Sequence, residues 1–230
     1  AVTVGPGDDC AVFAPAGQVV VSTDAMYEDV HFKKAWSGPH DVGRKAVGSA
    51  VADVEAMGAV PLGVVVALSA PADTPTDWAL EFTRGVREEC ELAGAALIGG
   101  DTTRGPVIGV VVTAFGDLQG RTPVLRSGAR AGDVVAYTGR LGMAAAGLAV
   151  LGRGFRSPGA VVRAHRVPEV PYGQGRVAAD AGATALIDCS AGPVADLGHV
   201  ARASGVAIDL DSATLDVDEA QKTVAAAIGG

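Results

Sequence analysis

Aromatic side chains are scarce in this chain: they make up 4% of its 230 residues, although apolar residues reach 49%. A hydrophobic core must therefore be built mainly from Val, Ala and Leu. The 32 glycines suit close backbone packing and ligand-binding loops, because a residue without a side chain lets another group approach the main chain. The length is sufficient for one large domain or two small ones.

Cysteine is also rare, and the three cysteines, Cys10, Cys90 and Cys189, lie at unrelated spacings. They form neither a disulfide framework nor a zinc-ligand pattern, which is typical of a protein in the reducing cytoplasm. The sequence shows no signal-peptide pattern and no apolar stretch long enough to span a bilayer. We therefore expect a cytoplasmic protein without a membrane partner.

Positive charge is in deficit, since 18 Lys and Arg residues face 26 Asp and Glu residues and the net charge is −8. This balance argues against nonspecific binding to nucleic acid or to anionic membranes, and we expect neither as a partner. An acidic protein that binds phosphorylated molecules needs metal ions to offset the repulsion between like charges.

Several well-known catalytic signatures are missing from the sequence. There is no G-x-x-x-x-G-K-[ST] motif, which excludes a P-loop NTPase, and no G-x-S-x-G nucleophile elbow. The glycines Gly139, Gly142 and Gly147 do not have the spacing of a dinucleotide-binding loop, so we interpret them as helix-packing residues.

The most informative stretch begins with the short apolar run 95–98, which ends at paired glycines and is followed by Asp101, Thr102 and Thr103. This pattern predicts a buried strand that ends at glycines. There a phosphate could approach the main-chain N–H groups closely, and a carboxylate could hold a divalent cation. Two other apolar runs end in a similar way, in Ser22-Thr23-Asp24 and in Asp188-Cys189-Ser190. The repetition favours a common polar site.

A helix is predicted over 41–57, because apolar residues cover one half of its surface. Asp53 falls inside the edge of this apolar arc, where a carboxylate is costly unless it is paired, hydrogen-bonded or bound to metal. Arg44 and Glu55 fall on the opposite half, and we expect Glu55 to be a solvated charge.

The first part of the chain alternates strands and helices, which indicates an α/β or α+β fold with its site at the carboxyl ends of the strands. A second helix should start near 74–77, capped by Thr74, and end at Gly94. From the residues alone, His31 is best interpreted as a hydrogen-bonded loop histidine. The predicted strands are 12–13, 19–21, 64–68, 95–98 and 107–115.

The regular pattern breaks between Gly120 and Asp133, which predicts a domain boundary that separates a domain at 1–125 from one at 132–230. Two arginines of this stretch, Arg121 and Arg130, could be either anion contacts or solvated linker charges. The second domain should have strands at 134–138, 184–188 and 206–210 and helices at 143–151, 174–181 and 193–203. Since the sequence stops where another strand is expected, we expect this domain to be incomplete.

Five carboxylates remain without an obvious structural role, together with neighbouring hydroxyl groups. Two carboxylates about 5 Å apart repel by roughly 3 kcal/mol at an effective dielectric constant near 20, so a shared pocket requires cations. Mg²⁺ prefers oxygen ligands and bridges carboxylates to phosphates, which is what phosphoryl transfer requires. Arg126 would suit a nucleotide phosphate. The residues in question are Asp9, Asp24, Asp53, Asp101 and Asp188, with Ser22, Thr23, Thr102 and Ser190.

A set of short motifs points to one protein family through its order and combination along the chain. The motifs are Gly7-Asp8-Asp9, Ser22-Thr23-Asp24, His31-Phe32, Arg44-Lys45-Ala46, Asp53 with Ala56-Met57-Gly58-Ala59, Gly99-Gly100-Asp101-Thr102, Arg126-Ser127-Gly128-Ala129 and Asp196-Leu197-Gly198-His199. They span nearly the whole chain. By them the chain resembles the thiamine-monophosphate kinase family, in the superfamily that also contains aminoimidazole-ribonucleotide synthetase and selenophosphate synthetase.

The resemblance implies a reaction in which ATP phosphorylates thiamine monophosphate to thiamine diphosphate, by direct in-line transfer without a phosphoenzyme. It implies a two-domain fold whose first domain binds ATP and metal and pairs its sheet with that of a second subunit in a barrel, so a homodimer is expected. It also implies that several Mg²⁺ ions are held by Asp9, Ser22, Thr23, Asp24, Asp53, Asp101 and Asp188, that ATP contacts Gly100, Asp101, Arg126 and Ser190, and that His31 contacts the substrate.

The chain departs from the family pattern at one site of interest. Where the family usually reads Ser-Asp-Gly-Leu, this chain reads Ser190-Ala191-Gly192-Pro193, so one metal-binding carboxylate is missing. Two alternatives therefore stay open beside the kinase. One is a nucleotide- and metal-binding homologue with little or no turnover, and the other is a superfamily synthetase with a different phosphate acceptor.

Overall fold

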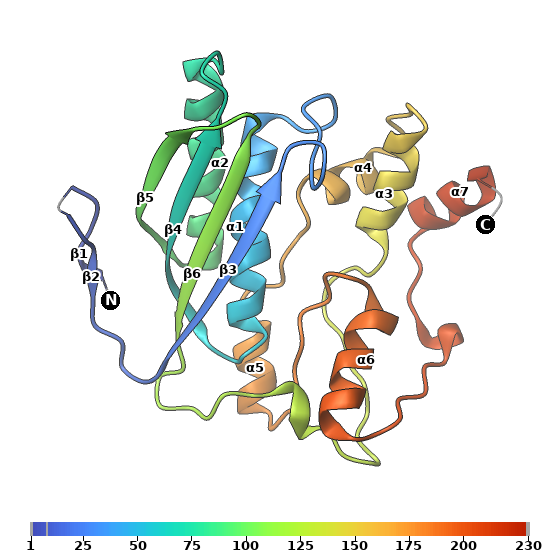
Figure 1. Cartoon of the computed structure of the whole chain (residues 1–230). Helices are drawn as coiled ribbons and strands as arrows, with labels where there is room; N and C mark the ends of the chain where they lie inside the picture. The colour runs from blue at the N-terminus through green and yellow to red at the C-terminus, as the bar shows by residue number, and fades with distance from the viewer. Residues whose placement is uncertain (1, 8, 229–230) are drawn as a thin grey trace.

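The computed structural model describes residues 2–7 and 9–228, so Asp8 of the predicted Gly-Asp-Asp motif lies outside the described residues. The first half of the chain forms a mixed α/β unit, which confirms the predicted fold class (Figure 1). Its elements are β1 (Val2–Val4), β2 (Val12–Phe13), β3 (Val19–Tyr27), α1 (Pro39–Glu55), β4 (Val60–Ala70), α2 (Thr76–Ala93), β5 (Ala96–Arg104) and β6 (Gly109–Asp117).

Four strands form one sheet in the order β3-β6-β4-β5. Strand β6 is antiparallel to both neighbours and β4 is parallel to β5, so β3, β4 and β5 run in the same direction. Helices α1 and α2 cover one face of this sheet (Figure 1). On the other face, Val19, Val21 and Tyr27 of β3 are exposed, at 40%, 59% and 43% of their surface.

Two of the strands extend further than their apolar runs predict. Ser22, Thr23 and Asp24 lie in the middle of β3, paired with β6, and do not follow the end of the strand. Likewise, β5 continues past the paired glycines, and Asp101 pairs with Ala67 of β4. The predicted strand ends were wrong because ladder hydrogen bonds depend on the neighbouring strand, and a polar side chain does not interrupt them.

Helices α1 and α2 pack closely because glycines lie at their crossing. A Cβ atom on Gly43 would lie 2.2 Å from the carbonyl oxygen of Phe82, and one on Gly85 would lie 2.1 Å from that of His40. The predicted inward face of α2 is confirmed by buried Phe82, Val86, Cys90 and Ala93. Gly94 ends the helix in the left-handed conformation, as predicted, but the predicted cap is absent: α2 is preceded by Pro75 and has no side-chain cap.

Glu55, on the outer half of α1, is not solvated, contrary to the sequence prediction. Glu55 is only 7% exposed and accepts hydrogen bonds from the backbone N–H groups of Gly173 and Gly175, at 3.0 and 3.2 Å. Arg44 forms an ion pair with buried Glu89 at 2.8 Å. The prediction failed because α2 and the segment around 170–175 cover this half of the helix.

The second half of the chain consists of helices and connecting segments, and residues 118–228 form no strand in the described structure. The predicted strands at 134–138, 184–188 and 206–210 are therefore wrong, because none of these segments pairs with another one. The predicted helices are present, and α4 and α7 are additional. The elements are η1 (Arg126–Gly128), α3 (Met143–Gly152), α4 (Gly159–Arg166), α5 (Gln174–Asp180), α6 (Pro193–Ser204), η2 (Ser212–Thr214) and α7 (Glu219–Ile228).

Helices α3, α4 and α7 share a small hydrophobic cluster that is separate from the main core. Gly147 allows the contact between α3 and α4, since a Cβ there would lie 2.1 Å from the carbonyl oxygen of Val161, which confirms its packing role. The two clusters agree with two units, and the boundary predicted between 125 and 132 stays a prediction. Within the described residues, no helix has the length and apolar character needed to cross a membrane.

Asp117, at the end of β6, holds the segment that precedes β3. It is 3% exposed and accepts hydrogen bonds from the backbone N–H groups of Ala16, Gly17 and Gln119, at 2.7, 2.9 and 2.7 Å. Burial alone would raise the pKa of Asp117, but these hydrogen bonds outweigh it and hold the pKa below its usual value.

We predict that Asp117→Asn lowers the free energy of unfolding by about 1–3 kcal/mol at pH 7, because the amide replaces a charged acceptor and directs N–H groups at backbone donors. Since the folded-state pKa is depressed, the stabilisation is present above the unfolded pKa of about 4 and is lost as the pH falls through the folded pKa. Urea unfolding at pH 7 and below pH 4 measures this, with Asp73→Asn on the exposed surface as control. A difference from wild type that stays the same at acid pH would contradict the prediction.

We also predict that Tyr172→Phe destabilises the fold by about 1–2 kcal/mol, because its hydroxyl donates to buried Glu89 at 2.6 Å. The expected signature is a lower urea midpoint, with no change for Tyr27→Phe, whose ring is 43% exposed. Equal effects of the two substitutions would show that the Glu89 contact contributes nothing specific.

Candidate functional site

A cavity of about 240 Å³ lies where the first unit meets the second. It brings together residues from β3, the end of α1, η1 and the segment 186–188, which are far apart in the sequence. The polar residues in its wall are Ser22, Asp53, Arg126 and Asp188, and the apolar ones include Val20, Met57 and Leu186. The apolar wall was not predicted from the sequence, because Met57 belongs to the apolar half of the helix predicted at 41–57 and was expected to face the core.

Asp53 is hydrogen-bonded at the edge of the apolar arc of α1, as its position requires. The hydroxyl group of Ser22 donates to its carboxylate at 2.5 Å. Burial raises the pKa of Asp53, and the charges of Asp188 and Asp24 raise it further, while the Ser22 hydrogen bond and the charge of Arg126 act in the opposite direction. Burial and the neighbouring carboxylates therefore make the ionised form of Asp53 less favourable than it is in water, and a nearby cation would stabilise it.

Asp24 lies two residues further along β3 and on the same face as Ser22. Burial raises the pKa of Asp24, and the charge of Asp188 adds to this effect, whereas the charge of His31 lowers the pKa. The pKa of Asp24 therefore depends both on the carboxylate of Asp188 and on His31 in the loop that follows β3.

Asp188 is the third carboxylate of the cluster, and its cationic neighbour is Arg126, at 3.9 Å between Nη2 and Oδ1. The Arg126 side chain is 54% exposed, so it is available to a ligand as well. Ser190 and Ala191 follow in an exposed turn before α6. The backbone N–H of Ala191 donates to Asp196 at 3.1 Å, which holds this turn in place.

The cluster of Asp24, Asp53 and Asp188 fits a hard divalent cation in its chemistry. Its donors are carboxylate and hydroxyl oxygens, and the repulsion between the carboxylates is not balanced by the one distant arginine. In the described part of the chain, no group of three or more Asp, Glu, His or Cys residues is close enough to hold a metal ion. A bound ion would therefore complete its coordination with water or with ligand phosphates, as Mg²⁺ commonly does.

Three other predicted ligands lie elsewhere. Thr23 projects from the opposite face of β3, where its hydroxyl shares a 3.1 Å hydrogen bond with that of Thr113. Asp101 is exposed on β5, and two strands separate it from β3, which corresponds to about 14 Å. Asp9 lies in the connection between β1 and β2, a hairpin beyond the β5 side of the sheet (Figure 1). Within one chain, the seven predicted metal ligands are therefore not gathered at one place.

Gly100 has a structural reason to be glycine that requires no ligand. A Cβ atom there would lie 2.1 Å from the carbonyl oxygen of Val66 on β4, so a side chain would separate β5 from its neighbour. The predicted position of the site at the carboxyl ends of the strands stays a prediction. The cavity lies along the first half of β3, because its other wall is the C-terminal end of α1.

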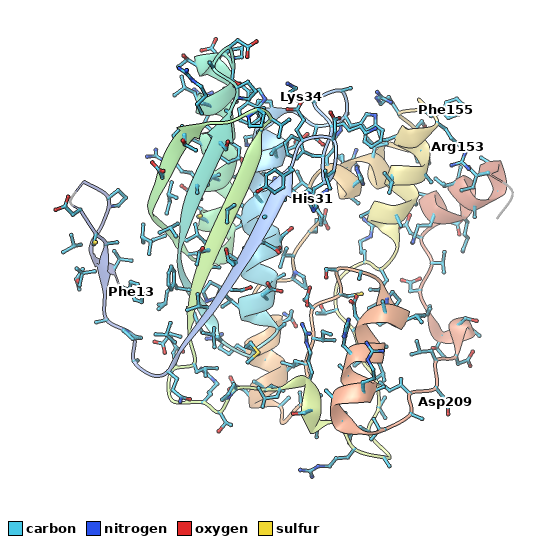
Figure 2. The ribbon with its side chains drawn as sticks, viewed as in Figure 1. Phe13, His31, Lys34, Arg153, Phe155 and Asp209 are labelled. Atoms are coloured by element: carbon cyan, nitrogen blue, oxygen red, sulfur yellow. The ribbon has the colours of Figure 1, made fainter. Side chains whose placement is uncertain are left out.

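His31 lies in the loop that follows β3, toward α3 and α4 (Figure 2). Its Nδ1 accepts a hydrogen bond from the backbone N–H of Tyr27 at 3.0 Å, which confirms the interpretation as a hydrogen-bonded loop histidine. Because Nδ1 is an acceptor, Nε2 carries the proton in the neutral ring and remains a potential donor. Its contact with a substrate stays a prediction.

A larger cavity, of about 510 Å³, lies beside the segment 121–128 that connects the two units. Its charged residues, Arg121 and Asp180, form an ion pair at 2.7 Å. Arg121 is therefore neither a free anion contact nor a solvated charge. The side chain of Arg130 is exposed, which agrees with a solvated linker charge.

Comparison with known proteins agrees with this geometry. Residues 7–118 match the N-terminal domain of AIR synthase related proteins. The chain is 50% identical to the thiamine-monophosphate kinase of Mycobacterium tuberculosis over 226 residues, which cover 98% of the chain and 68% of that protein.

Solved structures lead to the same family. The crystal structure of thiamine monophosphate kinase from Aquifex aeolicus superposes with a TM-score of 0.87 at 31% identity, over 93% of this chain and 73% of that one. AaThiL complexed with AMPPCP and TMP superposes with a TM-score of 0.83 at 32% identity, over 96% of this chain and 72% of that one. From the shared sequence and the shared fold, the chain belongs to the thiamine-monophosphate kinase family.

Proposed function

We propose that this chain transfers the terminal phosphoryl group of ATP to thiamine monophosphate, giving thiamine diphosphate and ADP. The observation that carries the proposal is the convergence of Ser22, Asp53, Asp188 and Arg126 on one cavity in a chain of this family. A relative of the same fold has been crystallised with AMPPCP, an ATP analogue that resists cleavage, and with TMP. We also infer a cytoplasmic location, where ATP is abundant and the free thiols of Cys10 and Cys189 stay reduced.

The proposed metal ligands are Asp53 and Asp188, which line this cavity, and Asp24, which lies on the same face of β3 as Ser22. Mg²⁺ bound there would neutralise phosphate charge and bridge the phosphates to the protein. Ser22 orients the carboxylate of Asp53 by its hydrogen bond. Arg126 lines the cavity with a side chain that is 54% exposed, so it could bind a nucleotide phosphate, and the proposed ATP contact Ser190 follows Asp188 by two residues.

The proposed reaction forms a bond between a phosphate oxygen of thiamine monophosphate and the γ-phosphorus of ATP. The bond between that phosphorus and the bridging oxygen breaks, and its electron pair leaves with ADP. Because the attacking phosphate oxygen is already ionised at neutral pH, the chain needs no general base. Its residues act by positioning and by electrostatic stabilisation, which supply most of the rate enhancement in phosphoryl transfer.

We further propose that two copies of the chain form a homodimer in which each sheet covers the open face of the other. The exposed apolar residues Val19, Val21 and Tyr27 lie on that face. In a barrel made from two such sheets, the β3 edge of one subunit would meet the β5 edge of the other. Asp101 and Gly100 of the second copy would then lie beside Thr23 of the first, which explains why these predicted ligands are separated within one chain.

A homologue that binds nucleotide and metal without turnover is the second candidate. The observation that favours it is Ala191, which stands where the resemblance predicts a carboxylate, next to Asp188 and Ser190. The division into a nucleotide-binding domain at 1–125 and a second domain at 132–230 is likewise proposed, from the two separate hydrophobic clusters.

A single-turnover assay tests the function directly. With ATP, Mg²⁺ and thiamine monophosphate, we predict formation of thiamine diphosphate and ADP in equal amounts, and neither product with EDTA present, because the phosphates then lack a cation. Chromatography of both products measures this. ATP binding without either product would favour the second candidate and end the kinase proposal.

We predict that Asp53→Asn lowers kcat/KM by about 100-fold or more, which corresponds to about 3 kcal/mol of lost stabilisation. In metal-free buffer, the same substitution should raise the thermal unfolding midpoint, because it removes a carboxylate whose pKa is raised by burial and like charges. Mg²⁺ should stabilise the wild type and have a smaller effect on the variant. Asp77→Asn, on the exposed start of α2, is the matched control, and equal responses of both variants to Mg²⁺ would reject the assignment.

A further inference from the structure

The side chain of Arg126 is only loosely held by its charged neighbour. It is 54% exposed, and its Nη2 lies 3.9 Å from Oδ1 of Asp188, a distance too long for a hydrogen bond. No other carboxylate in residues 2–7 and 9–228 forms an ion pair with it. The position of its guanidinium therefore depends on how the backbone of Arg126 is fixed.

This backbone belongs to η1, a single turn with little support from its surroundings. A turn of three residues leaves most of its N–H and carbonyl groups without a partner inside the turn. Leu125, which precedes η1, provides no side-chain cap. Cavities also lie against the turn, since Arg126 lines the cavity of about 240 Å³ and Ser127 and Gly128 line the one of about 510 Å³. The turn therefore needs an anchor from another element.

Ser204, in the last turn of α6, provides such an anchor. Helix α6 packs against η1 (Figure 1). The hydroxyl group of Ser204 donates to the backbone oxygen of Arg126 at 2.8 Å and accepts from the backbone N–H of Ala129 at 3.0 Å. A serine in a helix can donate to a carbonyl of its own preceding turn, but this hydroxyl donates to a separate segment. One side chain therefore binds the first residue of η1 and the residue that follows its end.

Near its other end, α6 holds the segment that carries Asp188. Asp196, in the first turn of α6, is 5% exposed and accepts hydrogen bonds from the backbone N–H groups of Ala191 and Gly192, at 3.1 and 2.8 Å. Ser204 follows Asp196 on the same helix at about 12 Å along its axis. The helix thus joins the two segments whose side chains, Arg126 and Asp188, line the same cavity.

We propose that Ser204 is a positioning residue for Arg126. Its hydroxyl group holds η1 where the guanidinium lines the cavity and can bind a nucleotide phosphate. The inference rests on the proposed function, which assigns that phosphate to Arg126. Ser204 acts through the backbone and does not touch the nucleotide. A shift of the turn by about 1 Å is enough to weaken a charge-assisted hydrogen bond between guanidinium and phosphate.

Calorimetric titration with AMPPCP and Mg²⁺ tests this role without turnover. In Ser204→Ala, which removes both hydrogen bonds to η1, we expect the Kd of AMPPCP to rise about 5-fold. Ser204→Thr keeps the hydroxyl group and should recover most of the affinity. Thr223→Ala is the matched control, because the Thr223 hydroxyl also donates to a backbone oxygen at 2.8 Å, but within its own helix α7. Its Kd should equal that of the wild type.

A double-mutant cycle with Arg126→Met separates positioning from general support of the fold. Arg126→Met alone should raise the Kd about 10-fold or more. In that background, Ser204→Ala should cause no further loss, because no guanidinium is left to position. An equal loss in both backgrounds, or a wild-type Kd in Ser204→Ala, would overturn the proposal. Should Ser204→Ala fail to fold, Ser204→Cys, whose thiol is a weaker hydrogen-bonding group, replaces it in the cycle with the same criteria.

The positioning role and the kinase function can fail separately. Binding that follows the cycle, in a protein that forms no thiamine diphosphate, would support the role of Ser204 and reject the function. In an active kinase, Ser204→Ala should raise the KM for ATP and leave the KM for thiamine monophosphate unchanged. Activity with an unchanged KM for ATP would support the function and reject the positioning role. A wild type that binds no AMPPCP would also reject this role, since Arg126 would then have no nucleotide phosphate to bind.

Discussion

The structure depends on helix α1 being covered on all sides. The sheet lies on one side of it, α2 on another, and segments of the second unit on the rest, so each of its polar side chains needs a partner. Four of its polar side chains have such partners on four different segments. The pairs are Arg44 with Glu89, Lys45 with the His31 carbonyl, Asp53 with Ser22, and Glu55 with the N–H groups of Gly173 and Gly175.

These contacts connect α1 to different neighbours. Arg44 binds Glu89 of α2 within the first unit, whereas Glu55 binds the segment 170–175 and so joins the second unit to the first. Asp53 lines the cavity beside β3, and Lys45, eight residues earlier, donates to the loop that follows β3. One helix therefore carries both a contact between the two units and a carboxylate of the candidate site.

The sheet explains why a single chain does not contain the whole predicted site. Ser22 and Asp24 face α1, while Thr23 faces the open side of the sheet, because side chains alternate along a strand. Asp101 lies at the opposite edge. A second sheet that covers the open face could bring the missing residues to Thr23 and to Asp101. It would also bury the apolar side chains that β3 exposes.

The local sequence pattern was enough to predict much of the fold, because the features that it predicts depend on residues that are neighbours along the chain. For this reason three predictions are confirmed: the buried face of α2, the end of α2 at Gly94 and the packing role of Gly147. The hydrogen-bonding requirement of Asp53 also followed from its angle on α1. The family followed from the order and combination of short motifs along the sequence.

Other features were decided by the tertiary structure. The burial of Glu55 and Arg44 depends on segments that are more than 30 residues away in the chain. The extents of β3 and β5, and the absence of paired strands at 134–138, 184–188 and 206–210, depend on which strand is available as a partner. The sequence by itself determined the family, the main helices and the residues with unusual charge. Only the tertiary structure decided which of those charges meet, because strand pairing and helix coverage are long-range contacts that no local pattern encodes.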